Sequence, residues 1–462
     1  MKKTTLFFAA LCVAFSLLGQ HITTEWKKDS GERYMGTNNY CRGMSLGVLD
    51  FNGTPEKVLL VASREGTASQ PEVISVNKLY ILDPETGNER TDLGSPIDLP
   101  SDPVSGGNLV INDVAVTADG KILVSNLTIG AGNLFEDGIA AFKVYLLDSP
   151  TAAPTLALYY ATPTTGTVRV SDYITVTGSI SDGTAKIYAT NLGAVYCWSM
   201  SDADQFDSEP EIIYSGNITG NMGYFDFLPG DDLNFLYSSI NSGALYFVID
   251  DVAYQGPSDT QLGVPGSARK VYFKYIATEG KDDEKYGAAY FAFLSVSTSS
   301  SSVPPSELKI AKLEQGWNND PAAKIGAITI EATSESLGAN TNGNGSGKIV
   351  SEIIGDDIYI YALATNNGIG KFKLSGIEEP KDMTTTGVKS PEATAFDITV
   401  ANNMLSVSGI DASSITLYNM MGQEVKSALN ANQLSVNGLR GIYVVRVTQG
   451  GAGVKTAKVL IF

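Results

Sequence analysis

A turn followed by an apolar, strand-like segment recurs six times between residues 50 and 377. The turns combine Asp with Gly, residue types that supply the positive φ angles required by tight hairpin turns. Successive turns lie about 61 residues apart, a period typical of a repeated four-stranded sheet. The six pairs are DFNG with KVLLVAS, ADG with KILVSN, SDG with KIYATN, GDD with LNFLYSS, GKDD with AAYFAFLSV, and GDD with IYIYALAT.

A second turn and further strands complete the repeated unit. Turns such as TNLG at 190–193 and TNNG at 365–368 lead into third strands, and a fourth strand such as LALYYAT at 156–162 follows in several units. The absence of a long helical period excludes a helical solenoid. The pattern predicts an all-β chain, with a β-propeller over residues 21–377 that has six blades, or seven if a long connection hides one.

The last unit contains only three strands before the chain leaves the repeat at residue 377. An open ring of sheets would leave strand edges without hydrogen-bond partners. We expect the segment from Ile22 to Lys27 to supply the missing outer strand and to close the ring.

The first twenty residues have the pattern of a secretory signal peptide. A basic start, Met1-Lys2-Lys3, precedes an apolar run over 6–18 that is too short to span a bilayer. We therefore expect an exported chain that begins near His21. Two cysteines remain, Cys41 and Cys197, and the sequence leaves open whether they pair.

A polar stretch at 378–391 separates the repeats from a C-terminal segment with a different pattern. Residues 392–462 contain about seven short alternating strands, which predict a small Ig-like β-sandwich. Within it stand three ordered motifs, ITLYNMMGQEV at 415–425, LRGIYVVRV at 439–447 and KTAKVLI at 455–461.

These motifs resemble the type A sorting domain of the type IX (Por) secretion system. The resemblance implies export by the type IX machinery to the outer-membrane surface or the medium. It also implies that Gly422, Gly441, Tyr443 and Lys458 belong to the sorting signal. Residues 25–377 more weakly resemble propeller-like domains of exported Bacteroidetes proteins, and DVAVTADGKILVSN at 113–126 resembles a blade opening of NHL-like propellers.

Charge and histidine content exclude several classes of function. The formal net charge of −18 repels nucleic-acid phosphates and anionic membranes. The single histidine, His21, lies beside the expected cleavage site, so Ser-His-Asp, Cys-His and His-ligated metal sites are unavailable to the repeats. We expect no cofactor, and calcium bound by oxygen ligands stays open as an alternative reading of the acidity.

Charged residues near the starts of the innermost strands are the candidate ligand-binding residues. In a propeller these positions line one mouth of the central channel. The alternative is that the aspartates hydrogen-bond neighbouring blades together. The candidates are four carboxylates, Asp113, Asp172, Asp226 and Glu352, and two arginines, Arg42 and Arg169.

Three functions remain open on the sequence alone. The favoured one is a secreted or surface-displayed module that binds an unknown glycan or protein without catalysis. The second is a hydrolase or lyase acting on polysaccharide, which would need two carboxyl groups about 5–10 Å apart in the channel mouth. The third is an envelope scaffold. The sequence assigns neither a catalytic residue nor a metal ligand.

Overall fold

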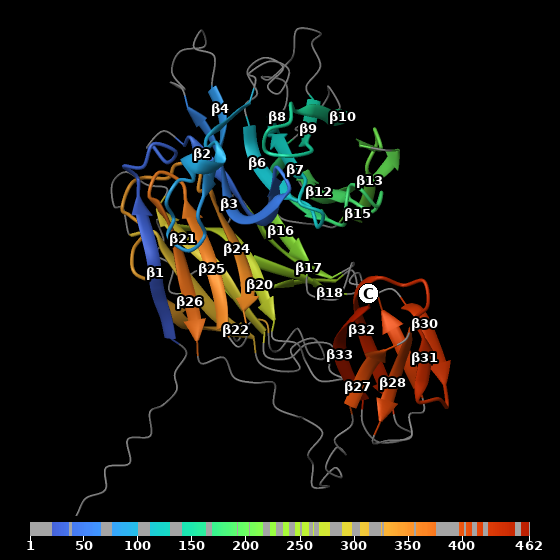
Figure 1. Ribbon diagram of the computed structural model, residues 1–462. Coiled ribbons are helices and arrows are strands. Elements are labelled where there is room, and N and C mark those ends of the chain that lie inside the picture. The colour runs from blue at the N-terminus through green and yellow to red at the C-terminus, as the bar shows by residue number, and fades with distance from the viewer. Residues whose placement is uncertain are drawn as a thin grey trace, which may run out of the picture. The chain divides into compact units, whose positions relative to one another are not determined.

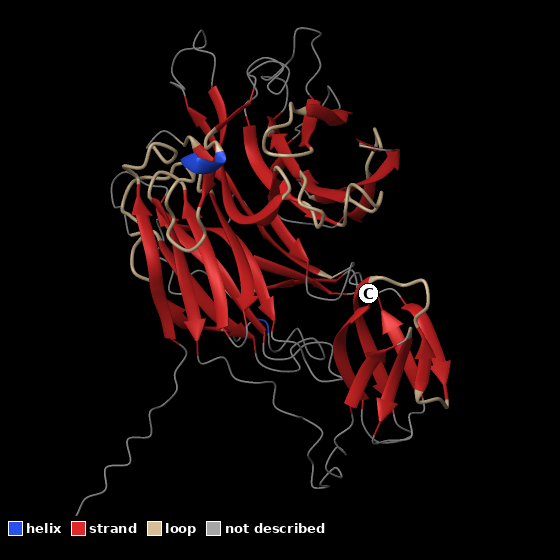
Figure 2. Ribbon diagram, viewed as in Figure 1, coloured by secondary structure: helices blue, strands red, loops and turns tan. Residues whose placement is uncertain are grey.

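The structure is a computed structural model of the chain, and most of its described residues are in strands (Figures 1 and 2). They divide into two compact units, the first with strands β1 to β26 and the second with β27 to β33. The described residues are 21–36, 39–65, 76–99, 111–129, 141–162, 169–191, 193–202, 204–215, 222–227, 234–239, 245–249, 252–257, 262, 268–277, 289–297, 305–313, 325, 328–354, 357–375, 397–401, 403–408, 414–418, 424–448 and 454–461.

The described part of the first unit contains six antiparallel sheets. Sheet 1 is β2 (Cys41–Phe51), β3 (Thr54–Glu65), β4 (Val76–Leu82) and β5 (Ile97–Leu99). Sheet 2 is β6 (Ile111–Val116), β7 (Ile122–Asn126), β9 (Ala141–Leu147) and β10 (Thr155–Ala161). Sheet 3 is β11 (Arg169–Thr177), β12 (Lys186–Asn191), β13 (Ala194–Asp202) and β15 (Glu211–Ser215), extended by β8 (Thr128–Ile129) and β14 (Gln205–Phe206).

The other three sheets follow in chain order. Sheet 4 is β16 (Met222–Phe227), β17 (Phe235–Ser239), β18 (Leu245–Ile249) and β19 (Val252–Gln255). Sheet 5 is β20 (Ala268–Ala277), β21 (Ala289–Ser297), β22 (Glu307–Leu313) and β23 (Thr329–Thr333). Sheet 6 is β24 (Gly347–Ile354), β25 (Asp357–Ala364), β26 (Gly368–Ser375) and β1 (His21–Asp29). A short 3₁₀ turn, η1 (Thr91–Leu93), lies between β4 and β5.

The first strands of the six sheets contact one another in a closed order. β2 contacts β6, β6 contacts β11, β11 contacts β16, β16 contacts β20, β20 contacts β24, and β24 contacts β2. The expectation of an all-β, propeller-like fold is therefore confirmed. Successive side chains of an innermost strand point to opposite faces of its sheet. One face therefore packs against the preceding sheet and the other against the following sheet.

The N-terminal strand completes the last sheet, as expected from the three-stranded final repeat. β1 is antiparallel to β26 and pairs from His21 with Ser375 to Asp29 with Gly368. Figure 1 shows β1 as the outer strand beside β26. The strand extends beyond the expected segment at both ends. The chain thus begins and ends its first unit within one sheet.

Apolar clusters lie between neighbouring sheets. One cluster joins β3 and β4 of sheet 1 to β6, β7 and β9 of sheet 2 through residues such as Leu60, Val114 and Val124. Another joins sheets 2 and 3, where Phe142 packs against Trp198 with ring centroids 5.2 Å apart. Trp198 is fully buried in this cluster, so it forms part of the core. Cys41 and Cys197 are both buried and not bonded to each other.

The turn residues have the conformations expected from the repeat. Asn52 (φ 57°) and Gly53 (φ 88°) turn β2 into β3, Gly120 (φ 78°) follows β6, and Gly183 (φ 65°) follows β11. The turns expected at 230–232 and 280–283, and the first two residues of the turn expected at 355–357, lie outside the described residues. The backbone therefore enters the second strand of sheets 1 to 3 through left-handed residues.

Gly43 marks the closest approach of β2 to β6. A Cβ at this position would lie 2.6 Å from Cα of Asp113, and a backbone atom cannot move aside easily. We expect Gly43→Ala to lower the free energy of unfolding by about 1–3 kcal/mol, because it forces two inner strands apart. Gly343→Ala is the matched control, since a Cβ at Gly343 would meet nothing within 4 Å. Urea unfolding of both variants checks this, and equal stabilities would contradict the close contact.

The second unit is built from two sheets that share one core. One sheet contains β27 (Asp397–Ala401), β28 (Met404–Ser408) and β31 (Gln433–Ser435). The other contains β29 (Ser414–Tyr418), β30 (Glu424–Leu429), β32 (Gly441–Thr448) and β33 (Val454–Ile461). Leu405 and Val407 of the first sheet pack with Ile415 and Val445 of the second. The strands expected from the sequence are all present.

Candidate functional site

The innermost strands share an irregularity near their first residues. The pairing register shifts between Cys41 and Gly43 in β2, and between Ile111 and Asp113 in β6. In β11 it shifts between Val170 and Ile174, and β16 and β20 have comparable shifts near their starts. Such β-bulges leave an extra residue outside the pairing and redirect its side chain. The bulged residues include Arg42, Asn112, Ser171 and Asp172.

Asp172 is the centre of a buried ion-pair group. Its two carboxylate oxygens accept hydrogen bonds from Arg169, Nε at 2.5 Å and Nη2 at 2.6 Å. Arg42 on β2 reaches the same carboxylate, with Nη2 3.5 Å from Oδ1. The Asp172 and Arg42 side chains are only 4% and 7% exposed. Bidentate pairing with Arg169 satisfies Asp172, so Arg42 holds only a long contact to it.

Asp113 forms a second buried ion pair, which joins three sheets. Its Oδ2 lies 2.5 Å from Nζ of Lys348 on β24 and accepts a hydrogen bond from the backbone N–H of Ile174 on β11 (2.8 Å). Burial raises the pKa of Asp113, and the Lys348 ammonium opposes that effect. These contacts favour the reading in which this aspartate ties neighbouring sheets together.

Tyr173 and Asn112 connect the two ion pairs. The Tyr173 hydroxyl accepts the N–H of Gly347 at 3.0 Å, and the Lys348 ammonium lies 5.3 Å from the centre of its ring. Burial raises the pKa of Tyr173 to about 12, so it is a neutral phenol at physiological pH. The Asn112 side chain donates to the carbonyl oxygens of Ser171 (3.2 Å) and Asp172 (2.6 Å).

Among the described residues at the bulges, three polar atoms are buried and have no hydrogen-bond partner in the protein. They are Nε of Arg42, Oδ1 of Asn112 and Oγ of Ser171. Buried polar atoms of this kind usually have a partner, in the protein or in ordered water. Ser171 also has a φ of 68°, an uncommon conformation for a residue with a Cβ that often occurs at functional sites.

The structure thus brings together four of the six candidate residues, Arg42, Asp113, Arg169 and Asp172. Asp226 is buried on β16, the next inner strand. Glu352 does not join them, because it lies further along β24 and bonds to the Lys57 ammonium and the Tyr361 hydroxyl. Sequence reasoning missed Lys348, Asn112 and Ser171, whose roles depend on contacts between segments far apart in the chain.

The residues of the sorting signal lie in the second unit. Gly441 begins β32, Tyr443 packs against the core of the two sheets, and Lys458 pairs with Val444 in the register of β32 and β33. Gly422 lies outside the described residues.

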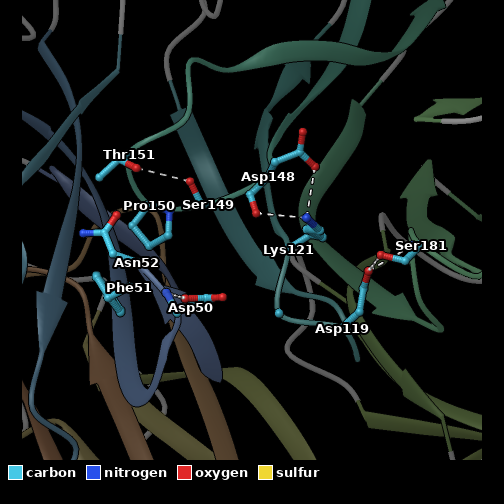
Figure 3. Close-up of a pocket in the computed structure, with 12 residues that line it drawn as sticks. Asp50, Phe51, Asn52, Asp119, Lys121, Asp148, Ser149, Pro150, Thr151 and Ser181 are labelled. Atoms are coloured by element: carbon cyan, nitrogen blue, oxygen red, sulfur yellow. Dashed lines mark hydrogen bonds and ion pairs between the residues drawn. The ribbon is translucent and has the colours of Figure 1, made fainter.

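A cavity lies at the opposite ends of the inner strands. The turns after β2, β6, β9 and β11 surround a cavity of about 390 Å³ (Figure 3). Its polar lining residues already bind one another: the Lys121 ammonium lies 3.3 Å from the Asp148 carboxylate, and Asp119 accepts hydrogen bonds from Ser181, N–H at 2.9 Å and hydroxyl at 2.7 Å. No group of three or more His, Cys, Asp or Glu residues in the described part of the chain could hold a metal ion.

Asp119 stabilises the contact between the turns of sheets 2 and 3. Hydrogen bonds from Thr117, Ser181 and Ile180 outweigh partial burial and lower the pKa of Asp119 to about 2. Because the pKa in the folded state is depressed, this stabilisation is complete above about pH 4 and is lost as the pH falls towards 2. Since the carboxylate is partly exposed, we expect Asp119→Asn to cost about 1 kcal/mol at pH 7.

Urea unfolding at pH 7 and pH 3 checks this prediction. The difference in unfolding free energy between Asp119→Asn and the unaltered chain should shrink at pH 3. The exposed Asp182 in the adjoining turn provides the control, and Asp182→Asn should have little effect at either pH. A cost for Asp119→Asn that is the same at both pH values would contradict the assignment.

The C-terminal part of the chain has a recognisable family. Residues 390–462 match the family model for the secretion system C-terminal sorting domain, Por_Secre_tail. The chain therefore carries a type IX sorting tail and is exported to the outer-membrane surface or the medium. No helix in the described residues is long and apolar enough to cross a bilayer.

No curated protein matches the chain. Among solved structures, an α-L-arabinanase from Penicillium chrysogenum complexed with arabinobiose is 12% identical and has a TM-score of 0.42, covering 78% of this chain and 99% of that one. A β-1,2-mannobiose phosphorylase from Listeria innocua is 11% identical with a TM-score of 0.31, covering 77% and 90%. The dihydro-haem d1 dehydrogenase NirN is 14% identical with a TM-score of 0.31, covering 85% and 68%. Likenesses at this level carry no functional inference.

Proposed function

We propose that the exported chain consists of a signal peptide at 1–20, a six-bladed β-propeller at 21–377, a linker at 378–391 and an Ig-like sorting domain at 392–462. The closed order of contacts among the six inner strands supports the blade count. The shared core of the two sheets in the second unit supports the Ig-like reading.

We further propose that the propeller is a non-catalytic binding module for an extracellular glycan or protein. One observation carries this proposal: three of the candidate carboxylates are occupied by ion pairs. Asp113 is held by Lys348, Asp172 by Arg169 and Glu352 by Lys57. A general acid or base has to exchange a proton with substrate, and these three carboxylates already bond to cations of the protein.

A combined binding and digestion screen of the purified full chain tests the proposal. The chain should retain one or more glycans or surface proteins and release no shortened product from polysaccharides. Release of oligosaccharides that Asp113→Asn or Asp226→Asn abolishes would overturn the proposal in favour of the hydrolase or lyase. If the chain neither binds a glycan or protein nor digests a polysaccharide, the result would favour the envelope scaffold.

A further inference from the structure

The hairpin turn between β2 and β3 is Asn52-Gly53, one of five Asn-Gly pairs in the chain. In such a pair the backbone nitrogen of the glycine can attack the side-chain amide of the asparagine, because glycine has no Cβ to block the approach. The attack forms a five-membered succinimide ring, which water then opens to aspartate or isoaspartate. Asparagine is for this reason one of the chemically labile residues of proteins.

The structure exposes this turn and leaves space around it. Asn52 and Gly53 are both exposed, and a Cβ at Gly53 would meet nothing within 4 Å. Both residues have left-handed backbone angles, φ 57° and 88°, so they form a tight turn outside the strand pairing. The succinimide ring therefore has room to form at this turn.

The carboxylate of Asp50 is placed to take the proton that the reaction releases. Its Oδ1 accepts a hydrogen bond from the Gly53 N–H at 2.5 Å, and the nitrogen of this group is the attacking atom. A backbone carbonyl in the same place could not remove the proton, whereas a carboxylate can act as a general base. Asp50 is itself exposed, so water has access to the reacting groups.

Two other Asn-Gly pairs are held in ways that oppose the reaction. Asn367 is 1% exposed; its Oδ1 accepts the N–H of Asn340 (2.7 Å), and its Nδ2 donates to the carbonyl of Thr365 (3.0 Å). Asn342 is fully buried, and its Oδ1 and Nδ2 both bond to the backbone of Ser346. A side-chain amide fixed in this way cannot turn towards the nitrogen of the following glycine.

We propose that Asn52 is a site of spontaneous deamidation promoted by Asp50. The Gly53 nitrogen forms a bond to Cγ of Asn52 while its proton passes to the Asp50 carboxylate. The bond between Cγ and Nδ2 then breaks, and Nδ2 takes up that proton and leaves as ammonia. Water hydrolyses the ring. The net reaction consumes one water, releases one ammonia and transfers no electron.

The product changes the cavity that Asn52 lines. Asp50, Asp119 and Asp148 line the same cavity, together with Lys121 (Figure 3). Deamidation adds a fourth carboxylate to these three, so the cavity becomes more negative. The isoaspartate product also lengthens the backbone of the two-residue turn by one methylene. The charge and the shape of this cavity therefore change as the chain ages.

Incubation of the folded full chain at pH 8 in water enriched in oxygen-18 tests the proposal. Ring opening incorporates the heavy oxygen, and mass spectrometry after peptic digestion in acid locates it. We expect Asn52 to be converted about tenfold faster than Asn342 and Asn367, or more. Asp50→Ser keeps a hydrogen-bond acceptor at the turn but removes the base, and should slow conversion of Asn52 by about threefold or more. It should leave conversion of the exposed Asn437 unchanged.

A comparison with the unfolded chain needs no variant. In concentrated guanidinium chloride, Asn52, Asn342 and Asn367 should be converted at similar rates, because every side-chain amide is then free to turn. Similar rates for the three residues in the folded chain, or no conversion of Asn52 there, would overturn the proposal. Circular dichroism establishes that Asp50→Ser is folded, and an unchanged rate at Asn52 in the folded variant would overturn the role of Asp50.

Discussion

Replacing Lys348 by Met is expected to lower the free energy of unfolding by about 3–5 kcal/mol, the largest effect of any single substitution considered. The Lys348 side chain is 6% exposed, and its ammonium is 2.5 Å from the wholly buried carboxylate of Asp113. Without the ammonium, Asp113 keeps only the N–H groups of Ile174 and Val114. Two backbone donors do not compensate a negative charge in an apolar interior.

The effect should depend on pH with a definite sign. In Lys348→Met the pKa of Asp113 in the folded state rises further above its unfolded value, because burial now acts without the opposing ammonium. The variant therefore regains stability as the pH falls and loses it as the pH rises. Urea unfolding at pH 5 and pH 7 should show a smaller deficit at pH 5.

Two controls isolate the buried pair. Lys373→Met removes a cation from a solvent-exposed pair with Asp357 and should cost far less stability than Lys348→Met, because water screens the exposed pair. The double variant Asp113→Asn with Lys348→Met should recover part of the loss, since no charge remains uncompensated. A Lys348→Met variant as stable as Lys373→Met would contradict the buried ion pair.

Deleting residues 21–30 is expected to abolish cooperative unfolding of the first unit, with a loss of more than about 4 kcal/mol. The deletion removes β1, the outer strand of sheet 6, together with Trp26. Trp26 donates from Nε1 to the carbonyl of Pro84 (3.0 Å), and its ring packs against Tyr361 with centroids 6.3 Å apart. The deletion also exposes the edge of β26, whose unpaired backbone groups can pair with another chain and cause aggregation.

Adding back the missing strand provides the decisive control. A synthetic peptide of residues 21–30, supplied in excess, should restore cooperative unfolding by pairing with β26. Thr23→Ala, at an exposed position of β1, should change stability by less than about 0.5 kcal/mol. An unchanged urea midpoint after the deletion would show that sheet 6 does not need β1.

The strands and turns could be predicted because their signals are local. The residue types of Asn52-Gly53 predict a hairpin turn by themselves. The alternation in IYIYALAT predicts a strand whose successive side chains point to opposite faces. The closing role of β1 also followed from the sequence, since a three-stranded last repeat leaves an edge to fill. The short strands β8 and β14 were missed, because two residues have no periodicity.

The candidate site could be predicted only in part. Asp113 and Asp172 were found because each stands near the start of an inner strand. Glu352 was grouped with them, yet β24 begins at Gly347, hidden in a glycine-rich loop, so Glu352 lies near the far end of its strand. Lys348 stands 235 residues from its partner Asp113, and a bulge such as that at Ser171 is a property of two paired strands. Neither the ion pair nor the bulge produces a pattern in the local sequence.

Amide hydrogen exchange of the intact chain, read by mass spectrometry over residues 21–29, tests most directly whether the first unit is a closed ring of sheets. Closure predicts that the alternate amides of residues 21–29 that face β26 exchange slowly, like those of β25, while the amides on the outer edge of β1 exchange fast. Complete exchange of residues 21–29 within seconds, while β25 stays protected, would contradict a ring closed by its N-terminal strand.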